Sequence, residues 1–274
     1  MPFAGCSPGE IAATLIGSSA ATCSLREEAV LAAQWPLRAL VKGEPGVGKR
    51  LLAKLIHRHS VRGNAKFLTV RCASASEDAL GAQLFGDPRS DFGGGVFARA
   101  DGGTLLLEDI DTLSPRLQAR LKRFVTDDDL QHSRSRSGRR IDVRIISSTT
   151  IPLTGNTPAL FSTDLYYLLN PIYLEIRPLR ERPEDVQPLL EYFTSYYARR
   201  SGVATPELTE ECLALCRAYA WPGNLRQLQA AAAMFVGDVA KEPRPVVDDA
   251  AFVRWSVRTP EHQPETSIPI AAAP

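Results

Sequence analysis

The sequence predicts an α/β fold, in which a mainly parallel sheet lies between helices, followed by a small all-helical domain. Between about residue 15 and residue 176, short apolar runs alternate with helical patterns. Beyond residue 177 the strand pattern stops and helical segments follow one another. Strands that alternate with helices imply βαβ units and parallel pairing. A chain of 274 residues is long enough for one large domain or two smaller ones.

The predicted strands are short runs rich in Leu, Ile and Val, as expected for strands covered on both faces. They are Ala39–Val41, Phe67–Cys72, Thr104–Ile110, Asp142–Thr150 and Ile172–Ile176.

Three helices are predicted after the sheet, with no strand between them, at Val186–Arg200, Glu207–Tyr219 and Leu225–Val239. Pro and Gly in "SGVATP" and "WPGN" separate them. From residue 241 onward the chain is Pro-rich, and we expect loop or disorder with one short helix around Asp249–Val257 and no helix-turn-helix pattern.

Composition excludes several classes of function. The net charge of +1 gives no general attraction to nucleic acid or membrane, and no apolar run is long enough to span a bilayer. The five cysteines are scattered, and no secretory signal is evident, so a reduced, cytoplasmic location is expected. Cys212 and Cys216 lie four apart on a predicted helix. Packing on one helix face is favoured, and a redox or metal pair is the alternative.

A glycine-rich loop, "GEPGVGKR" from Gly43 to Arg50, follows a predicted strand and opens a helix. This is the context in which G-x-x-x-x-G-K binds phosphate, and a coincidental glycine turn is the alternative. Gly46 and Gly48 let backbone N–H groups surround phosphate oxygens, and Lys49 would reach the β- and γ-phosphates. Arg50 occupies the position of a hydroxyl that normally ligates Mg²⁺. It either points along the helix surface or weakens metal binding.

A second signal is "GGTLLLEDIDTL", an apolar strand that ends in two acids. Nucleoside triphosphatases hold their metal ion and attacking water in this way, with Asp before Glu. Here Glu108 precedes Asp109, which moves each carboxylate by roughly a methylene, and misplacement of about 1 Å can cost about 10²-fold in rate. A tolerated swap and a loss of chemistry are both open interpretations.

Several stretches together resemble the AAA+ domain of bacterial enhancer-binding proteins, the sigma-54-dependent transcriptional activators. They are "LIGSSAATCSLREEA", "GEPGVGKR", "QLFGD", "ADGGTLLLEDID", "DVRIISSTT", "PLRERPEDV" and "AWPGNLRQL". The resemblance implies a P-loop nucleotide-binding domain at 15–177 and a helical lid at 178–240, between an N-terminal extension at 1–14 and a Pro-rich tail at 241–274. It also implies rings with ATP at the subunit interfaces.

The resemblance implies a set of site residues for ATP or ADP. The catalytic positions would be Glu108 and Asp109, as an altered Walker B pair, and Thr149 as a sensor, with Glu108 also the ligand of any Mg²⁺. The nucleotide would be held by Ile16, Gly17, Gly43, Glu44, Pro45, Gly46, Val47, Gly48, Lys49, Arg50 and Arg226.

The chain also departs from the family pattern at specific positions. Arg71 replaces an Asn that controls the catalytic Glu, and it could lock the acids through a salt bridge. Ser162 and Leu168 replace the two arginine fingers that reach a neighbouring subunit's ATP. In the "DFGGG" segment the GAFTGA loop that touches sigma-54 is missing, so the usual sigma-54 contact is not expected.

The leading hypothesis is a divergent ATP-binding AAA+ protein in transcriptional regulation, impaired in hydrolysis and in sigma-54 contact. Its expected partners are proteins: copies of itself, or an intact AAA+ activator in a mixed ring. A nucleotide-responsive interaction module and an ordinary active sigma-54 activator are the alternatives. The Arg-rich loop at 134–140 is either solvated or a contact for a polyanion or acidic partner.

Overall fold

The computed structural model describes residues 14–86, 95–126, 141–153, 161–240, 242 and 245–258. The "DFGGG" segment, except Gly95, and the Arg-rich loop lie outside these ranges, as do most of the N-terminal extension and of the tail. The chain forms two compact units. We call them the sheet unit (Met1–Leu15, Ser24–Glu44 and Gly48–Ile176) and the helical unit (Ile16–Cys23, Pro45–Val47 and Arg177–Pro274).

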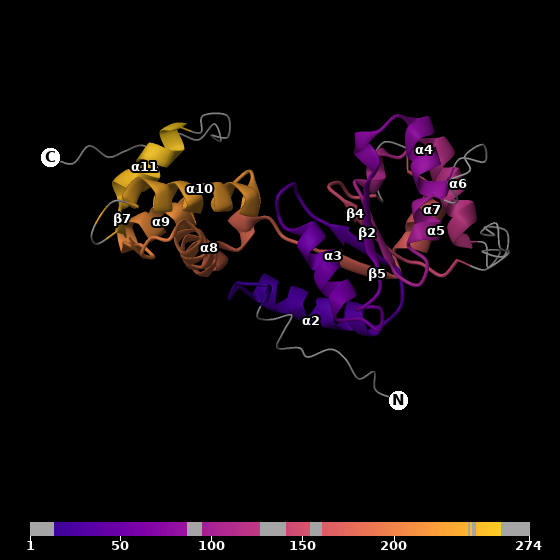
Figure 1. Ribbon diagram of the computed structural model, residues 1–274, viewed down its shortest axis with the longest axis horizontal. Helices are drawn as coiled ribbons and strands as arrows, with labels where there is room; N and C mark the ends of the chain where they lie inside the picture. The colour runs from indigo at the N-terminus through magenta and orange to yellow at the C-terminus, as the bar shows by residue number, and fades with distance from the viewer. Residues whose placement is uncertain are drawn as a thin grey trace. The chain divides into compact units, whose positions relative to one another are not determined.

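The sheet unit contains five parallel strands in the order β2-β3-β4-β1-β5 (Figure 1). All five predicted strands are confirmed; β1 is one residue longer than predicted, and the other four are slightly shorter. The strands are β1 (Ala39–Lys42), β2 (Phe67–Arg71), β3 (Thr104–Glu108), β4 (Arg144–Thr149) and β5 (Ile172–Glu175).

The strand predicted to continue to Ile110 ends at Glu108. Asp109 adopts a left-handed conformation with φ 56°, which breaks the extended backbone. A 3₁₀ turn, Ile110–Thr112, follows directly. The turn carries the chain away from the sheet and leaves the two acids at its carboxyl edge.

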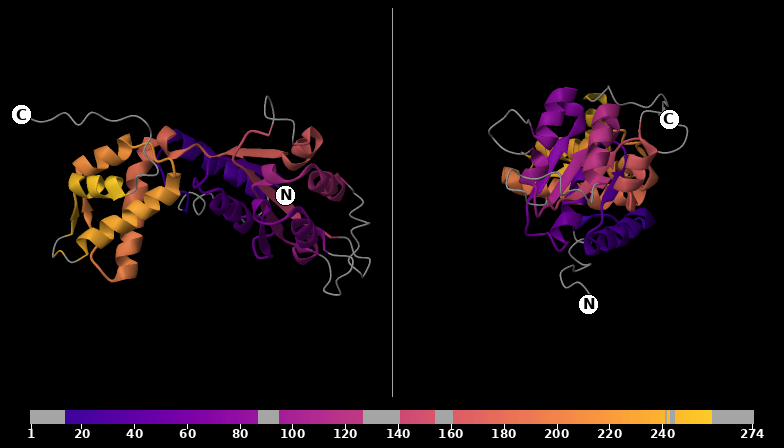
Figure 2. Two further views of the ribbon diagram at one scale, coloured as in Figure 1. Left: turned by 90° about the horizontal axis from the view of Figure 1, so that it is seen from above. Right: turned by 90° about the vertical axis from the view of Figure 1, so that its right-hand side faces the viewer.

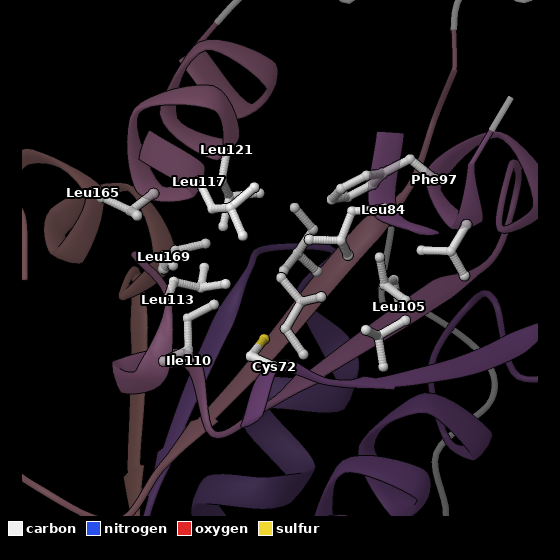
Figure 3. Packing of buried hydrophobic residues seen from close by; sticks show 14 of the residues in the cluster. Cys72, Leu84, Phe97, Leu105, Ile110, Leu113, Leu117, Leu121, Leu165 and Leu169 are labelled. Carbon is white, nitrogen blue, oxygen red and sulfur yellow. The ribbon is translucent and has the colours of Figure 1, made fainter. Parts of the chain in front are cut away.

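One face of the sheet is covered by α4 (Glu77–Phe85), α5 (Val96–Arg99), α6 (Pro115–Thr126) and α7 (Thr163–Leu169). Figure 3 shows Leu105 of β3 in the same core as Leu84, Phe97 and Leu121 of these helices. Side chains alternate along a strand, so Leu106 points to the opposite face. That residue is also fully buried, which shows that both faces are covered.

The helix that follows the glycine loop is α3 (Lys49–Arg58), which contacts β1 and β3 and buries Leu52 and Ile56. The preceding helix, α2 (Ala20–Gln34), is tied to the start of β4. There, Arg144 Nη2 donates to the carbonyl of Ala32 at 2.5 Å. The helices therefore bracket a buried parallel sheet, as the apolar strands predict.

The helical unit consists mainly of α8 (Val186–Ser201), α9 (Glu210–Ala218), α10 (Asn224–Val239) and α11 (Asp249–Arg258). These helices, orange to yellow in Figures 1 and 2, pack α8 against α10 and α9 against α11. Their shared core holds the aromatic rings of Trp221, Phe235 and Trp255. The short helix predicted around Asp249–Val257 is confirmed, and Phe252 and Trp255 place it in this core.

The prediction of no strand between these helices is wrong. Glu207–Leu208 (β6) pairs in parallel with Val246–Val247 (β7). The helix predicted from Glu207 begins at Glu210, because the Thr209 hydroxyl caps it by accepting from the Cys212 N–H. The residues ahead of the cap are therefore free to be extended.

Cys212 and Cys216 are buried, free thiols in the core of the helical unit. This confirms the packing interpretation. Within the described ranges, no group of His, Cys, Asp or Glu side chains is arranged to hold a metal ion, and no helix is long and apolar enough to cross a membrane.

A buried carboxylate organises the segment that leads into α2. Asp185 is fully buried, and its Oδ1 accepts from the backbone N–H groups of Ser18 at 2.7 Å and Ser19 at 2.8 Å. Its Oδ2 accepts from the hydroxyls of Ser19 and Thr22 and lies 3.5 Å from Arg182 Nη1. All of these residues belong to the helical unit.

We expect Asp185→Ala to lower the free energy of unfolding by about 3–5 kcal/mol, because it leaves the buried Arg182 charge uncompensated. The matched control is Glu184→Ala, whose exposed side chain lies one residue away and should change stability by less than about 0.5 kcal/mol. Chemical denaturation measures both. Equal, small effects of the two substitutions would contradict the role given to Asp185.

Candidate functional site

The glycine loop has the backbone that close approach to phosphate requires. Gly46 and Gly48 have φ values of 81° and 107°, in the left-handed region that favours glycine. A β-carbon on Gly46 would clash with the carbonyl oxygen of Gly223. The loop ends where α3 begins at Lys49, so the N-terminus of that helix follows it directly.

Lys49 folds back over the loop that precedes it. Its Nζ donates to the carbonyl oxygens of Gly43 at 2.6 Å and Glu44 at 3.1 Å. The loop is in turn tied to β4, because the Gly43 N–H donates to the Thr149 carbonyl at 3.2 Å. The ammonium group is therefore held against the loop.

Pro45–Val47 belong to the helical unit, where a buried amide anchors them. Asn224 Nδ2 donates to the Pro45 carbonyl at 3.1 Å, and Asn224 Oδ1 accepts from the Leu179 N–H at 2.8 Å. Arg226 lies two residues after Asn224 and is exposed, and a β-carbon on Gly46 would lie 3.4 Å from its Cβ. The contact of Asn224 with the loop was not predicted from the sequence, although Asn224 lies inside the quoted "WPGN" motif.

Ile16 and Gly17 also lie in the helical unit. Ile16 packs against its core. Gly17 has φ 147°, and a β-carbon there would lie 2.5 Å from the Asp185 carboxylate. Glycine is therefore required at this position by the Asp185 contacts.

The first acid of the altered pair is held by Arg50. Arg50 Nε donates to Glu108 Oε1 at 2.9 Å, and Arg50 Nη2 donates to Oε2 at 2.6 Å. The Glu108 side chain is 12% exposed, whereas the side chain of Arg50 is 56% exposed, so solvent reaches the pair from the arginine side. Its hydrogen bonds raise the pKa of Arg50. Arg50 thus crosses to β3 and does not lie along the surface of its helix.

The second acid is paired as well. Arg71 Nε lies 3.3 Å from Asp109 Oδ2, which confirms the salt bridge expected from the sequence. The register of the sheet explains the contact, because Arg71 of β2 stands opposite Glu108 of β3. Both acids at the end of β3 therefore face an arginine.

These residues do not fit a magnesium ion in the arrangement seen here. Mg²⁺ requires oxygen ligands in near-octahedral geometry. Both oxygens of Glu108, the ligand predicted from the sequence, accept hydrogen bonds from Arg50. Arg50 itself takes the place of a ligating hydroxyl.

Thr149 lies at the end of β4 beside the start of the glycine loop, as predicted. Its hydroxyl donates to the Ile151 carbonyl at 2.9 Å and accepts from the Ile151 N–H at 3.2 Å. The residue is 1% exposed. The hydroxyl is therefore engaged with its own strand end.

The residues at the two positions that would carry arginine fingers make hydrogen bonds within the sheet unit. Ser162 caps α7 by accepting from the Leu165 N–H, and its own N–H donates to Gln118 Oε1 at 2.7 Å. The Leu168 carbonyl accepts from Arg38 Nε at 2.6 Å. Neither residue carries a charge toward another subunit.

A parallel sheet in the order β2-β3-β4-β1-β5, with a glycine loop between β1 and α3, defines a P-loop nucleoside triphosphatase fold of the AAA+ class. The chain matches the sigma-54 interaction domain over residues 15–175 and the AAA+ ATPase lid domain over residues 180–237. This protein belongs to the sigma-54 interaction domain family.

Its relatives include transcriptional regulators. The chain is 37% identical over 222 residues to the transcriptional regulatory protein ZraR of Klebsiella oxytoca, covering 78% of this chain and 50% of ZraR. It is 39% identical over 197 residues to the sigma54-dependent transcriptional regulator SfnR of Pseudomonas fluorescens, covering 69% of this chain and 54% of SfnR. The chain thus spans about half the length of these relatives.

Among solved structures, the chain is similar to NtrX from Brucella abortus. The complex of NtrX with ATP superposes with a TM-score of 0.79 at 28% identity, covering 95% of this chain and 59% of NtrX. The complex with ADP has a TM-score of 0.76 at 29% identity, covering 86% and 55%.

We expect Gly46→Ala to lower the melting temperature, because left-handed strain alone costs about 1–3 kcal/mol and the new methyl group meets Gly223. Gly237→Ala is the matched control. Gly237 is exposed on α10 with open space around it, so alanine there should stabilise by about 0.4–1 kcal/mol. Opposite shifts in thermal unfolding are expected, and a stabilising effect of Gly46→Ala would contradict the loop geometry.

Cys72 directly follows β2, and the pKa of its thiol is affected by the acids at this edge of the sheet. Burial, and then the charges of Asp109, Asp111 and Glu108, raise its pKa to about 12. Its thiol should therefore remain protonated at about pH 8, near the ordinary thiol pKa. We expect iodoacetamide to label the exposed Cys23 and to spare Cys72 in the folded protein, as read by peptide mass spectrometry. Equal labelling of both before unfolding would contradict this environment.

Proposed function

We propose that this protein is an ATP- or ADP-binding AAA+ protein that acts in transcriptional regulation and hydrolyses ATP slowly or not at all. The observation that carries the proposal is the pairing of both acids at the end of β3 with arginines, beside an intact phosphate loop. Impaired sigma-54 contact is proposed on the sequence of the "DFGGG" segment alone.

Nucleotide binding is supported by the loop itself. Gly46 and Gly48 have the backbone that lets N–H groups surround phosphate oxygens, and Lys49 lies over the same loop. Arg226 is the lid residue proposed to contact the nucleotide, and it is exposed. The similarity to NtrX in complex with ATP and with ADP supports the same ligands for this chain.

Slow hydrolysis is supported by the state of the two acids. A carboxylate that activates water must reach it with a free oxygen, whereas both oxygens of Glu108 accept from Arg50. Asp109 sits on left-handed backbone and faces Arg71. A misplacement on the order of 1 Å costs about 10²-fold in rate, so these changes together are expected to suppress turnover.

The residues at the two arginine-finger positions support assembly with a second, different AAA+ protein. An arginine finger supplied to a neighbouring site is worth about 10³–10⁵ in rate in other nucleoside triphosphatases. Ser162 and Leu168 supply none, so this chain would not complete a neighbour's site. An intact activator could still complete the site of this chain, which favours a mixed AAA+ ring as the assembly.

We expect the purified protein to bind ATP and ADP in calorimetric titrations and to release phosphate far below the rates of an active relative measured in parallel. Lys49→Ala should abolish binding, because it removes the ammonium from the loop. Lys54→Ala is the matched control, since Lys54 is exposed on the same helix.

Steady phosphate release at the rate of an active relative, lost in Lys49→Ala, would contradict impaired hydrolysis. Absence of nucleotide binding in the wild-type protein would contradict the proposed function as a whole.

A further inference from the structure

The pairing of Arg50 with Glu108 is geometrically strong. Two parallel N–H···O bonds of 2.9 and 2.6 Å join a planar guanidinium to one carboxylate. Bonds between two charged groups are about twice as strong as neutral ones, and the two-point geometry fixes their orientation. The pair uses Nε and Nη2 of Arg50 and leaves Nη1 outside it. Arg50 is the second residue of α3 and directly follows Lys49.

Two arginines supply much of the positive charge that a metal ion would bring to this edge of the sheet. The charged groups in the glycine loop, in the first turn of α3, on β2, and at and after the end of β3 are Glu44, Lys49, Arg50, Arg71, Glu108, Asp109 and Asp111. With Lys49 as the only cation, the four carboxylates would leave three excess negative charges and repel a phosphate chain. Arg50 and Arg71 cancel two of these three charges, which is the charge that one Mg²⁺ would supply.

A magnesium ion would have to compete with these arginines for the same oxygens. To ligate the ion, Glu108 must leave Arg50 and give up two charge-assisted hydrogen bonds. The ion would then lie close to two guanidinium groups that cannot lose their charge. Repulsion from Arg50 and Arg71 therefore opposes metal binding even where a nucleotide offers phosphate oxygens.

We propose that this protein binds its nucleotide without magnesium, with Arg50 and Arg71 in place of the divalent cation. The site then takes a metal-free nucleoside di- or triphosphate. Arg50 neutralises Glu108 and presents its remaining N–H groups beside the phosphate loop. The inference rests on the proposed nucleotide binding and adds the requirement that no metal takes part.

The test is a calorimetric titration of the wild-type protein with ADP and with ATP, in excess EDTA and in excess MgCl₂. The expected dissociation constants in EDTA are equal to those in magnesium or lower, because Mg²⁺ sequesters part of the free nucleotide. Tight binding that appears only with magnesium overturns the inference and leaves the proposed nucleotide binding intact. Absence of binding under both conditions overturns both.

The double variant Arg50→Ser/Arg71→Asn returns uncharged side chains to both positions. It should lose at least about tenfold in affinity in EDTA, which corresponds to about 1.4 kcal/mol, and regain it with magnesium. Arg58→Ser is the matched control: it removes a positive charge from the exposed far end of the same helix and should keep the wild-type pattern. A double variant that binds as tightly as wild type in EDTA would contradict the role of the arginines.

A second readout follows the metal itself. Electron paramagnetic resonance of Mn²⁺, added to the protein with ADP, should show no ion bound beyond that held by free ADP. The double variant should take up one ion per nucleotide. A protein-bound Mn²⁺ signal in the wild type would overturn the inference.

Discussion

The register between β2 and β3 is the constraint on which the candidate site depends. Parallel pairing sets Arg71 opposite Glu108, and each strand leaves the core at that step. Because all five strands are parallel, their carboxyl ends meet at one edge, where the glycine loop after β1 also begins. If β2 slipped by one residue against β3, the side chains of β2 would exchange faces of the sheet. Arg71 and Glu108 would then lose their alignment, and charge would be buried in the apolar core.

The same register explains why charged groups are tolerated so close to the core. Leu105 and Leu107 of β3 are fully buried, and Glu108 follows directly at 12% exposure. A carboxylate in this position requires a partner, since burial of an unpaired charge is costly. The helical unit follows the same rule with Asp185, which meets backbone and hydroxyl donors as well as Arg182. In both units, an arginine near a carboxylate makes a buried acid compatible with the fold.

The sequence predicted most of this architecture because buried parallel strands are almost continuous runs of Leu, Ile and Val. It could not predict the two-residue strands β6 and β7, which are too short to show periodicity. Arg71 was suggested as a lock on the acids through the family resemblance, because it stands where the family has an Asn that controls the catalytic Glu. The sequence left Arg50 open, because the direction of a long side chain depends on contacts between elements far apart in the chain. Asn224 was missed for the same reason: its partners, Pro45 and Leu179, come from distant segments.

The changes at the end of β3 and at the finger positions are chemically consistent with one another. A finger stabilises charge that develops on a transferring phosphoryl group, and it is useful only where a carboxylate and a metal ion prepare the attack. In this chain Arg50 pairs with that carboxylate, so a finger, even one supplied by a partner in a mixed ring, would accelerate hydrolysis less than in an active relative. Arg50 cannot take over that role for its own nucleotide either, because the Glu108 pair fixes its guanidinium. The cations near the loop neutralise charge in the ground state, and equal stabilisation of ground and transition states gives binding without catalysis.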